Sequence, residues 1–595
     1  MGLDIKRKER LEVSRTLRHA GREPKRRGAV RVEHLVEQYE ADLSTLERTY
    51  PVTVSPARLE RLDAFHRMHL DTLAEVDLDG LEADAQVDLV LLDNHIRRRL
   101  HAIERARATL ARARPLLSFA EPILDLENAH RLHQRPPADL TARRLDALAR
   151  AVRALTDAIG ADSPERPTEA ADPGLANLAA DAVAELREAL KRWFAFYDDY
   201  DPVATWWLKG PCAGADEALG AYERRLREAA APGDRIAGTP IGEEAVRAEL
   251  RDDLIAYEPS EVLAIARREL AWCRAEMVRA SREMGLGDDW RAALERVKDM
   301  HVPPGDQPEM IYGLAAEARA FLDAHGLVTV PPLCDETWRA EMMSPERQLV
   351  NPFFLGGEVI RISYPTSTMS HAQRLMSMRA NSTYLSRSTV FHELIPGHYL
   401  QQFMTARHMP HRRLFRTPYW SEGNAFYWEM LLWNLGFARR PEERIGMLFW
   451  RSHRAARVLY TLGFHSGRMT TEECVEMLVR DIGHERDSAM GEVRRLFDPH
   501  YAPLYQCAYL LGALQFRALH EELVVGASMS ERSFHDAILR QGPMPVEILR
   551  AVLRGERLTP PYLAHWRFYG DPGSEDPAHA PSGSSRERGA GGPNP

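Results

Sequence analysis

The stretch from Phe391 to Gln401 constrains this chain more than any other part of its sequence. It holds two imidazoles and a carboxylate, those of His392, His398 and Glu393, within a short apolar run. Histidine nitrogens and carboxylate oxygens are common protein ligands of zinc. The stretch therefore predicts a metal site in which both histidines bind the ion.

The spacing of the two histidines predicts a break in the helix that carries them. They are six residues apart, which separates them by about 240° on a regular helix. In the H-E-x-x-H arrangement of zincins, the two histidines share one helix face. Pro396 and Gly397 lie in the gap, and they are the residue types most able to break or kink a helix. We therefore expect a distortion that lets His392 and His398 reach one ion.

A second stretch, from Trp420 to Glu429, supplies a third ligand. Glu422 lies 24 residues after His398, a distance that lets a second helix fold back beside the first. Glu429 follows seven residues later, so about two helical turns place it on the same face as Glu422. We expect Glu422 to be the third protein ligand. Glu429 is expected to hold the far nitrogen of a ligand histidine.

These two stretches resemble the DUF885 family of bacterial proteins, which is grouped with the zinc-metallopeptidase superfamily. HELIPGHYLQ and EGNAFYWE are similar to the family's HE-x-x-PGH-x-x-Q and EGWALY-x-E. The resemblance covers roughly residues 340 to 520 and includes three further matches: Arg454-Ala455-Ala456-Arg457 leading to Gly463-Phe464-His465 (RA-x-R…DTGLH), Glu492-Val493 (EV-x-RY), and Pro503 with Tyr509-Leu510-Leu511-Gly512 (P-x-QALSYKxG).

The chain also departs from the family pattern at four positions. Asn424 replaces a Trp of the motif, Thr461 an Asp, Leu496 a Tyr and Tyr505 a Gln. None of these changes removes a proposed metal ligand. They leave the class of substrate open.

Zinc is the ion that this ligand set favours, because two imidazoles and one carboxylate leave a fourth position open. Bound zinc lowers the pKa of a water molecule towards ~7. Glu393 is placed to take the proton of that water and to deliver it to a leaving nitrogen.

His465 and Tyr509, which match family motifs, are candidate oxyanion donors, although each is equally well explained as a core residue. Three arginines are candidates for binding a substrate carboxylate, with a buried ion pair as the alternative for each: Arg454, Arg457 and Arg517.

We therefore expect a zinc-dependent hydrolase that cleaves an amide bond, in a peptide short enough to enter a cleft. One alternative is hydrolysis of a non-peptide amide or ester on a small metabolite, since Asn424 and Tyr505 would suit a reshaped pocket. Another is a peptide-binding scaffold without catalysis. The presence of Glu393 argues against the scaffold, because a pure binder needs the metal ligands but not the base. The sequence leaves the oligomeric state open.

Composition excludes some partners and indicates a compartment. The 595 residues carry a net charge of -9, so bulk charge does not indicate a nucleic-acid partner. No run of about 18 apolar residues occurs, and no apolar segment of a secretory signal precedes Ala29, so we expect neither a membrane span nor secretion. The five scattered cysteines favour free thiols in a reducing cytoplasm.

The expected fold class is mainly α: a large helical array with a zincin-like metallopeptidase core. Helical periodicity runs through residues 31–326, broken by Pro and Gly. A zincin-like catalytic half follows at 327–570, with helices expected over 419–435, 441–465, 470–479, 484–497 and 504–523. Residues 1–30 are basic and expected to be flexible, and residues 571–595, which are poor in apolar side chains, are expected to be disordered.

A small β structure is expected at the active-site cleft. Residues 327–330 have the pattern of a strand, and residues 348–355 are expected to pair with 359–364 across Gly356-Gly357-Glu358. Pro352 indicates an edge strand, because proline has no N–H to donate to a ladder. The resemblance implies that such an edge receives an extended substrate. The alternative is a hairpin that only covers the core.

Overall fold

The computed structural model describes residues 31–160, 168–230, 236, 238–348, 353–498, 501–526 and 528–570. These residues are mainly α-helical, with one small mixed sheet, so the expected mainly-α class is confirmed. The expectations for residues 1–30, 571–595 and Pro352 fall outside the described ranges. Within those ranges, no helix is both long enough and apolar enough to cross a membrane. The boundary at 326/327 stays a prediction.

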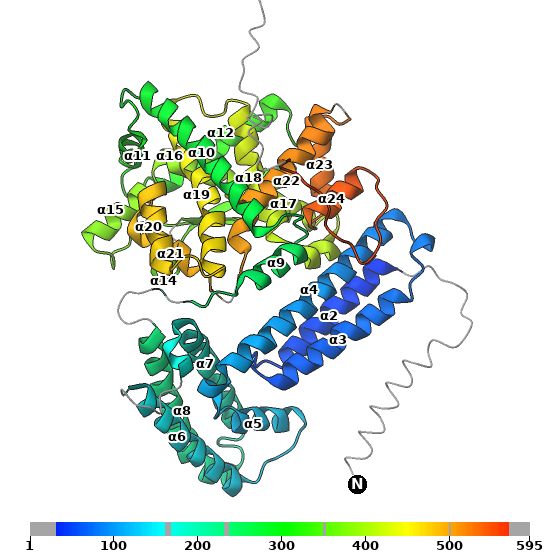
Figure 1. Ribbon diagram of the computed structural model, residues 1–595, viewed down its shortest axis with the longest axis vertical. Coiled ribbons are helices and arrows are strands. Elements are labelled where there is room, and N and C mark those ends of the chain that lie inside the picture. Colours follow the sequence, from blue (N-terminus) through cyan, green and yellow to red (C-terminus); the bar gives the residue numbers. More distant parts are fainter. Residues whose placement is uncertain are drawn as a thin grey trace, which may run out of the picture.

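The first three helices lie side by side at one flank of the molecule (Figure 1). They are α2 (Val32–Thr49), α3 (Pro56–Ala74) and α4 (Ala83–Ala113). Their buried side chains, such as Tyr39 and Ile96, belong to the same hydrophobic core as Phe426, which lies in the C-terminal half of the chain. Buried Arg412 donates to Asp88 of α4 at 2.6 Å. The N-terminal helices are thus joined to the later ones by apolar burial and by a buried ion pair.

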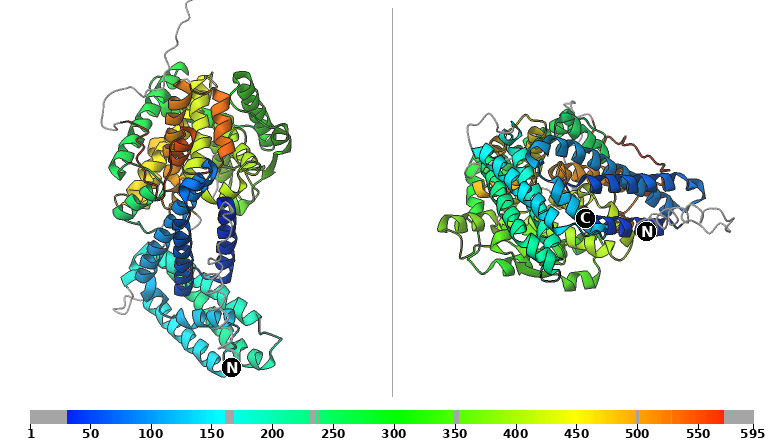
Figure 2. Two further views of the ribbon diagram at one scale, coloured as in Figure 1. Left: turned by 90° about the vertical axis from the view of Figure 1, so that its right-hand side faces the viewer. Right: turned by 90° about the horizontal axis from the view of Figure 1, so that it is seen from below.

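The next four helices form a group with its own hydrophobic core. They are α5 (Glu121–Arg131), α6 (Ala138–Gly160), α7 (Pro173–Ala195) and α8 (Pro202–Ala230). Leu145, Val183 and Leu219 are buried in that core, where the Tyr222 hydroxyl donates to the Leu116 carbonyl at 3.0 Å. Figure 2 shows α2–α4 between this group and the remaining helices.

The remaining helices include those that carry the candidate site residues His392, His398 and Glu422. They are α9 (Glu243–Asp252), α10 (Pro259–Glu283), α11 (Trp290–Lys298), α12 (Gln307–His325), α13 (Pro332–Thr337), α14 (Pro345–Gln348), α15 (His371–Ala380), α16 (Thr383–Glu393), α17 (His398–Thr405), α18 (Pro418–Asn434), α19 (Pro441–His465), α20 (Thr471–Met477), α21 (Arg486–Arg494), α22 (Ala508–His520), α23 (Glu531–Gln541) and α24 (Val546–Leu553). The expected helices at 419–435 and 441–465 are confirmed. Those expected at 470–479 and 504–523 also form, because π-helical turns at Leu478–Ile482 and Glu521–Val525 extend α20 and α22, and a 3-10 turn at Tyr505–Cys507 precedes α22. Only α21 is shorter than the expected 484–497. Every residue of α18 from Tyr419 to Leu432 is buried, as is typical of a helix in the centre of a large core.

The sheet has three short strands in the order β1-β3-β2. They are β1 (Arg339–Met342), β2 (Phe354–Leu355) and β3 (Val359–Ile362). β2 pairs antiparallel with β3, with Leu355 opposite Arg361, so a hairpin forms as expected. Its first strand is shorter than the expected 348–355, however, and Gln348 belongs to α14. β1 pairs parallel with β3, with Arg339 opposite Val359. The two edges of the sheet are therefore β1 and β2.

The strand expected at 327–330 was wrong, and β1 forms twelve residues later instead. Leu327 and Val328 are buried in an irregular segment. Side chains of α23 satisfy the backbone there, because Asp536 accepts from the Thr329 N–H at 2.9 Å and His535 contacts the Leu327 carbonyl at 2.9 Å. The apolar run is thus buried without a strand partner, since side chains supply its hydrogen bonds.

A pair of glycines lets α18 and α22 approach closely. A Cβ on Gly423 would lie 2.6 Å from the Gly512 Cα, and a Cβ on Gly512 would lie 2.2 Å from the Tyr419 carbonyl oxygen. Neither position therefore has room for a larger residue. The contact brings the helix that carries Glu422 beside the helix that begins with Ala508 and Tyr509.

Candidate metal centre

The helix that carries His392 is broken as the sequence predicts. α16 ends at Glu393, and α17 begins at His398. Leu394, with φ -107° and ψ -104°, takes the chain out of the helical conformation. Two separate helices therefore present the two histidines, which removes the conflict with regular helical spacing.

Gly397 allows the chain to return to the end of α16. Its N–H donates to the Phe391 carbonyl at 3.0 Å. A Cβ at this position would lie only 1.8 Å from the His392 carbonyl oxygen, so a side chain is sterically excluded. The close approach places the His398 ring with its centroid 4.9 Å from that of His392.

Hydrogen bonds at the outer nitrogens orient both imidazoles. His392 Nδ1 lies 2.8 Å from Glu429 Oε1, and His398 Nδ1 lies 3.5 Å from Gln401 Oε1. Both oxygens are acceptors, so each Nδ1 can donate its proton there, which directs each Nε2 towards Glu422. Gln401 is itself held, because its Nε2 donates to the Ser421 carbonyl and to Asn424 Oδ1 at 3.0 and 3.1 Å.

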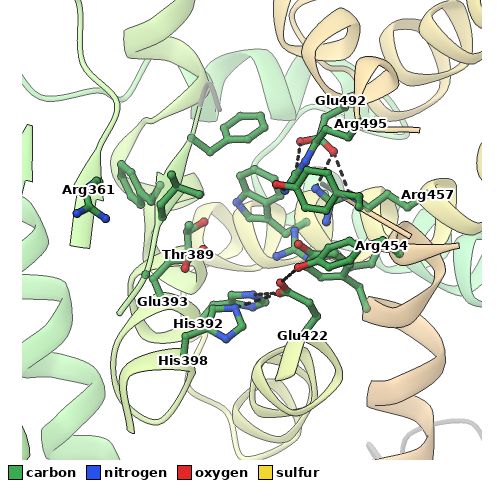
Figure 3. A pocket seen from close by; sticks show the side chains of 18 of the residues that line it. Arg361, Thr389, His392, Glu393, His398, Glu422, Arg454, Arg457, Glu492 and Arg495 are labelled. Atoms are coloured by element: carbon green, nitrogen blue, oxygen red, sulfur yellow. Dashed lines mark hydrogen bonds and ion pairs between the residues drawn. The ribbon is translucent and has the colours of Figure 1, made fainter. Parts of the chain in front are cut away.

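Glu422 completes a set of three ligand atoms. Its Oε2 lies 3.0 Å from His398 Nε2 and 3.4 Å from His392 Nε2, and Figure 3 shows the three side chains converging. Zinc bonds of about 2.0–2.2 Å in tetrahedral geometry separate neighbouring ligand atoms by roughly 3.3 Å. The atoms present therefore fit a zinc ion in chemical type, and the two distances from Glu422 to the histidines fit it in spacing.

Glu393 lies beside this set. Its carboxylate is within 4.8 Å of both histidine nitrogens, and Figure 3 shows it on the opposite side of the imidazoles from Glu422. A Cβ on Gly356 would lie 2.4 Å from Glu393 Oε2. The turn between β2 and β3 therefore covers Glu393 directly, and this turn needs a glycine to do so.

The electrostatics of the site favour a bound cation. Burial opposes protonation of His392, but hydrogen bonds to Glu422 and Glu429 outweigh it and raise the pKa of His392 to about 9. Burial would raise the pKa of Glu422, yet His398 and His392 hold that pKa well below its usual range. Burial raises the pKa of Glu393. A site in which neighbouring carboxylates stabilise positive charge on His392 suits a metal ion in place of a proton.

Two residues support the glutamates from outside the ligand set. Arg454 Nη2 donates to Glu429 Oε1 at 3.0 Å. The Tyr505 hydroxyl donates to Glu422 Oε1, the oxygen that does not face the histidines. In the sequence, Tyr505 stands out only as a departure from the family pattern that would suit a reshaped pocket, with no contact to a metal ligand expected. That departure was the signal that could have found it.

The site opens into a pocket of about 250 Å³. Besides the metal-site residues, the hairpin lines it with Phe353, Phe354, Leu355, Gly356 and Arg361, and α19 with Trp450, Arg454 and Arg457. Three tyrosines also line it: Tyr501, Tyr505 and Tyr509. The other lining residues are Arg347, Thr389, Gln402, Arg416, Glu492 and Arg495. From the sequence, Glu492 is part of a family match without an expected role, and no role is expected of Arg495. Glu492 accepts from Arg457 at 2.6 Å and from Arg495 at 3.1 Å.

Of the remaining candidate site residues, Tyr509, His465 and Arg517, one lines the pocket and two do not. Tyr509 lines the pocket, with its ring nearly parallel to that of His392 at 6.2 Å. His465 and Arg517 do not line it. His465 is buried at the end of α19, and burial lowers its pKa to about 4. Arg517 forms an ion pair with buried Glu269 at 3.7 Å. Both are therefore explained as core residues in this structure.

The molecule is thus a mainly α-helical protein with a buried His–Glu cluster between α16, α17 and α18. The family DUF885, described as "Bacterial protein of unknown function", matches residues 43–553. The chain belongs to this family. Among curated proteins, no sequence matches it.

Two solved structures share the fold. One, from Shewanella oneidensis, is 18% identical, with a TM-score of 0.65 over 88% of this chain and 100% of that chain. The other, from Colwellia psychrerythraea, is 16% identical, with a TM-score of 0.56 over 88% of this chain and 98% of that chain. Both are described as a "putative lipoprotein", the first of them as having an unknown function. At these identities the likeness concerns the fold alone.

Proposed function

We propose that this protein is a zinc-dependent hydrolase that cleaves an amide bond in a short peptide. One observation carries the proposal: Glu422 Oε2 lies 3.4 Å from His392 Nε2 and 3.0 Å from His398 Nε2, the separation of neighbouring ligands around tetrahedral zinc. A free carboxylate, Glu393, lies next to them. A metal-dependent peptide-binding scaffold would need the three ligands but not this carboxylate.

The roles of the protein's own side chains follow from their positions. Bound zinc would supply Lewis-acid activation of a water molecule and of a substrate carbonyl. Glu393 takes the proton of the attacking water and passes it to the leaving nitrogen. Burial raises its pKa towards the working pH, which makes the return of the proton easier than from an exposed carboxylate.

Tyr509 is the better placed of the two oxyanion donors suggested by the sequence. Burial raises its pKa, so the hydroxyl keeps its proton at neutral pH and can donate it in a hydrogen bond. Arg457 lies 4.2 Å from the centre of the Tyr509 ring and holds it in place. The Tyr505 hydroxyl is engaged with Glu422. We therefore assign the donor role to Tyr509 and leave His465 out.

The β2 edge is the proposed binding site for an extended peptide. Phe354 and Leu355 pair with β3 on one side and line the pocket together with Gly356. A peptide that adds to such an edge gains main-chain hydrogen bonds. The pocket volume of about 250 Å³ is below the range of about 300–1,000 Å³ typical of small-molecule sites. This favours a short substrate, and it keeps a small non-peptide amide as the second candidate.

The compartment is also a proposal. All five cysteines are buried and unpaired, as expected in a reducing cytoplasm. A lipid anchor is the competing possibility, because both structural neighbours are described as a "putative lipoprotein". Separation of native cells into cytosolic and membrane fractions distinguishes the two, since an anchored protein remains with the membranes in high salt.

The test of the proposed function combines metal analysis with a substrate screen. The purified protein should carry about one zinc per chain. Incubation with a mixed library of peptides and acylated metabolites, read by mass spectrometry, should yield cleaved peptides that are absent after chelation. Cleaved metabolites alone would favour the second candidate. No products at all would favour the scaffold.

Ligand substitutions should reduce zinc content in a graded way. We expect His392→Ala, His398→Ala and Glu422→Ala to lose most of the bound zinc, because each removes one of three ligands. Glu429→Gln should weaken zinc binding only by about 10- to 100-fold, as is typical of a residue that orients a ligand.

The matched control is His408→Ala, since His408 is exposed just beyond α17 and should leave zinc content unchanged. Zinc content is measured by atomic emission on gel-filtered protein. Full retention in His398→Ala would show that the six-residue spacing does not serve metal binding.

A further inference from the structure

The pocket has the opposite charge to the rest of the protein. Six arginines line it (Arg347, Arg361, Arg416, Arg454, Arg457 and Arg495), against three glutamates (Glu393, Glu422 and Glu492). The whole chain has a net charge of -9. Positive charge is therefore concentrated where the substrate binds, and a zinc ion would add to it. A concave site of one sign raises the local concentration of ligands of the other sign.

Arg454 is a buried cation with unused donors. Its Nη2 donates to Glu429, but its Nε and Nη1 are buried and have no partner among the described residues. The guanidinium lies 4.9 Å from the Trp450 ring centre and 5.6 Å from that of Tyr509. Buried N–H groups without a partner are costly and rare in native proteins. A guanidinium presents its donors in a planar fork that matches a carboxylate.

The pocket wall opposite the hairpin has more positive than negative side chains, even when the ion pairs within it are counted. Arg457 and Arg495 share one carboxylate, that of Glu492. The Nε of Arg495 is buried and has no partner in the described part of the chain. Two guanidinium groups on one carboxylate leave one positive charge beside Tyr509.

The mouth of the pocket carries three further arginines. Arg361 on β3 has Glu341 as its only ion-pair partner in the described chain, at a distance of 3.9 Å, and Figure 3 shows it on the strand side of the pocket. Arg347 and Arg416 are exposed. Neither forms an ion pair with any residue that the structure describes. These three guanidinium groups are therefore available for a ligand.

We propose that the substrate of this site is an acidic peptide: one carboxylate of the substrate binds Arg454 inside the pocket, and a second binds Arg361 at its mouth. This inference rests on the proposed hydrolase function and names the substrate class for it. A carboxylate and a phosphate would both present anionic oxygens that a guanidinium group binds. The peptides compared below distinguish a carboxylate from a phosphate as its source.

The first experiment compares matched fluorogenic peptides that carry Glu, Gln, Lys or phosphoserine at the same two positions, with the zinc-loaded protein. We expect kcat/KM for the Glu peptide to exceed that for the Gln peptide by about tenfold or more, the size of one charge-assisted hydrogen bond. Added salt should reduce this preference, because charges near the solvent are screened. Equal cleavage of Glu and Gln peptides, or a preference for phosphoserine, would overturn the assignment.

The second experiment changes the mouth of the pocket. Arg361→Gln should raise KM for the Glu peptide by roughly tenfold, with kcat unchanged and with no effect on the Gln peptide. Arg361→Glu should shift the preference towards the Lys peptide. The control is Arg339→Gln, which makes the same charge change on the neighbouring strand, at a residue outside the pocket lining. An equal effect of both glutamine variants would overturn the role of Arg361.

A binding measurement separates this inference from the hydrolase proposal. Calorimetry with Glu393→Gln protein reports peptide binding even if no peptide is ever cleaved. Glu-peptide binding that is weakened by Arg361→Gln would support the inference although hydrolysis had failed. Cleavage of Glu and Gln peptides at equal rates, with equal binding, would leave the hydrolase intact and overturn the inference.

Discussion

Glu393→Gln is expected to keep its zinc and to turn over substrate roughly 10³ to 10⁴ times more slowly than the unchanged protein. General acid–base catalysis is typically worth about 10² to 10⁴-fold in rate, or roughly 3 to 5 kcal/mol of barrier. Here one carboxylate serves both proton transfers, so the upper part of that range applies. Glutamine preserves the size of the side chain but cannot take a proton at neutral pH. Turnover and zinc content are measured on the same samples.

The matched control is Glu358→Gln, in the turn between β2 and β3 that covers Glu393. Glu358 is exposed and does not line the pocket, so its variant should retain full turnover. A Glu393→Gln protein with both full zinc and full activity would refute the metallohydrolase mechanism. Loss of zinc from this variant would instead indicate that Glu393 contributes to metal binding, since its carboxylate lies within 4.8 Å of a nitrogen of each histidine.

Gly397→Ala is expected to destabilise the protein by at least about 3 kcal/mol and to abolish zinc binding. The added Cβ would lie 1.8 Å from the His392 carbonyl oxygen and 2.5 Å from its carbonyl carbon. Both are backbone atoms, so no side-chain rotation relieves the contact. The connection between α16 and α17 must open, which separates His392 from His398. Chemical denaturation and zinc analysis measure the two effects.

Gly313→Ala is the control for that prediction. Gly313 lies in α12, where an added Cβ would have no other atom within 4 Å, so alanine should be neutral or stabilise the helix by up to about 1 kcal/mol. If Gly397→Ala matched this control in stability and zinc content, the close return of the chain would not be needed for the site.

Local features of the sequence were sufficient to indicate the candidate metal centre. His392, His398 and the breakers between them lie within one short stretch, and helical periodicity alone relates Glu422 to Glu429. These inferences depend on backbone geometry over a few residues, where spacing and residue type decide the result. The hairpin around Gly356 was predictable for the same reason.

Tertiary structure decided which distant residues join that centre. The contact of Tyr505 with Glu422 spans 83 residues, and it depends on the Gly423–Gly512 approach of α18 and α22. His465 and Arg517 match the helical character of their neighbours, yet neither lines the pocket: His465 lies at the far end of α19, and Arg517 pairs with buried Glu269. Residues 327–330 have the composition of a strand, but side chains of α23 satisfy their backbone instead. Such outcomes depend on how whole helices pack and rotate, and the pattern within one segment carries no information about the surface it will meet.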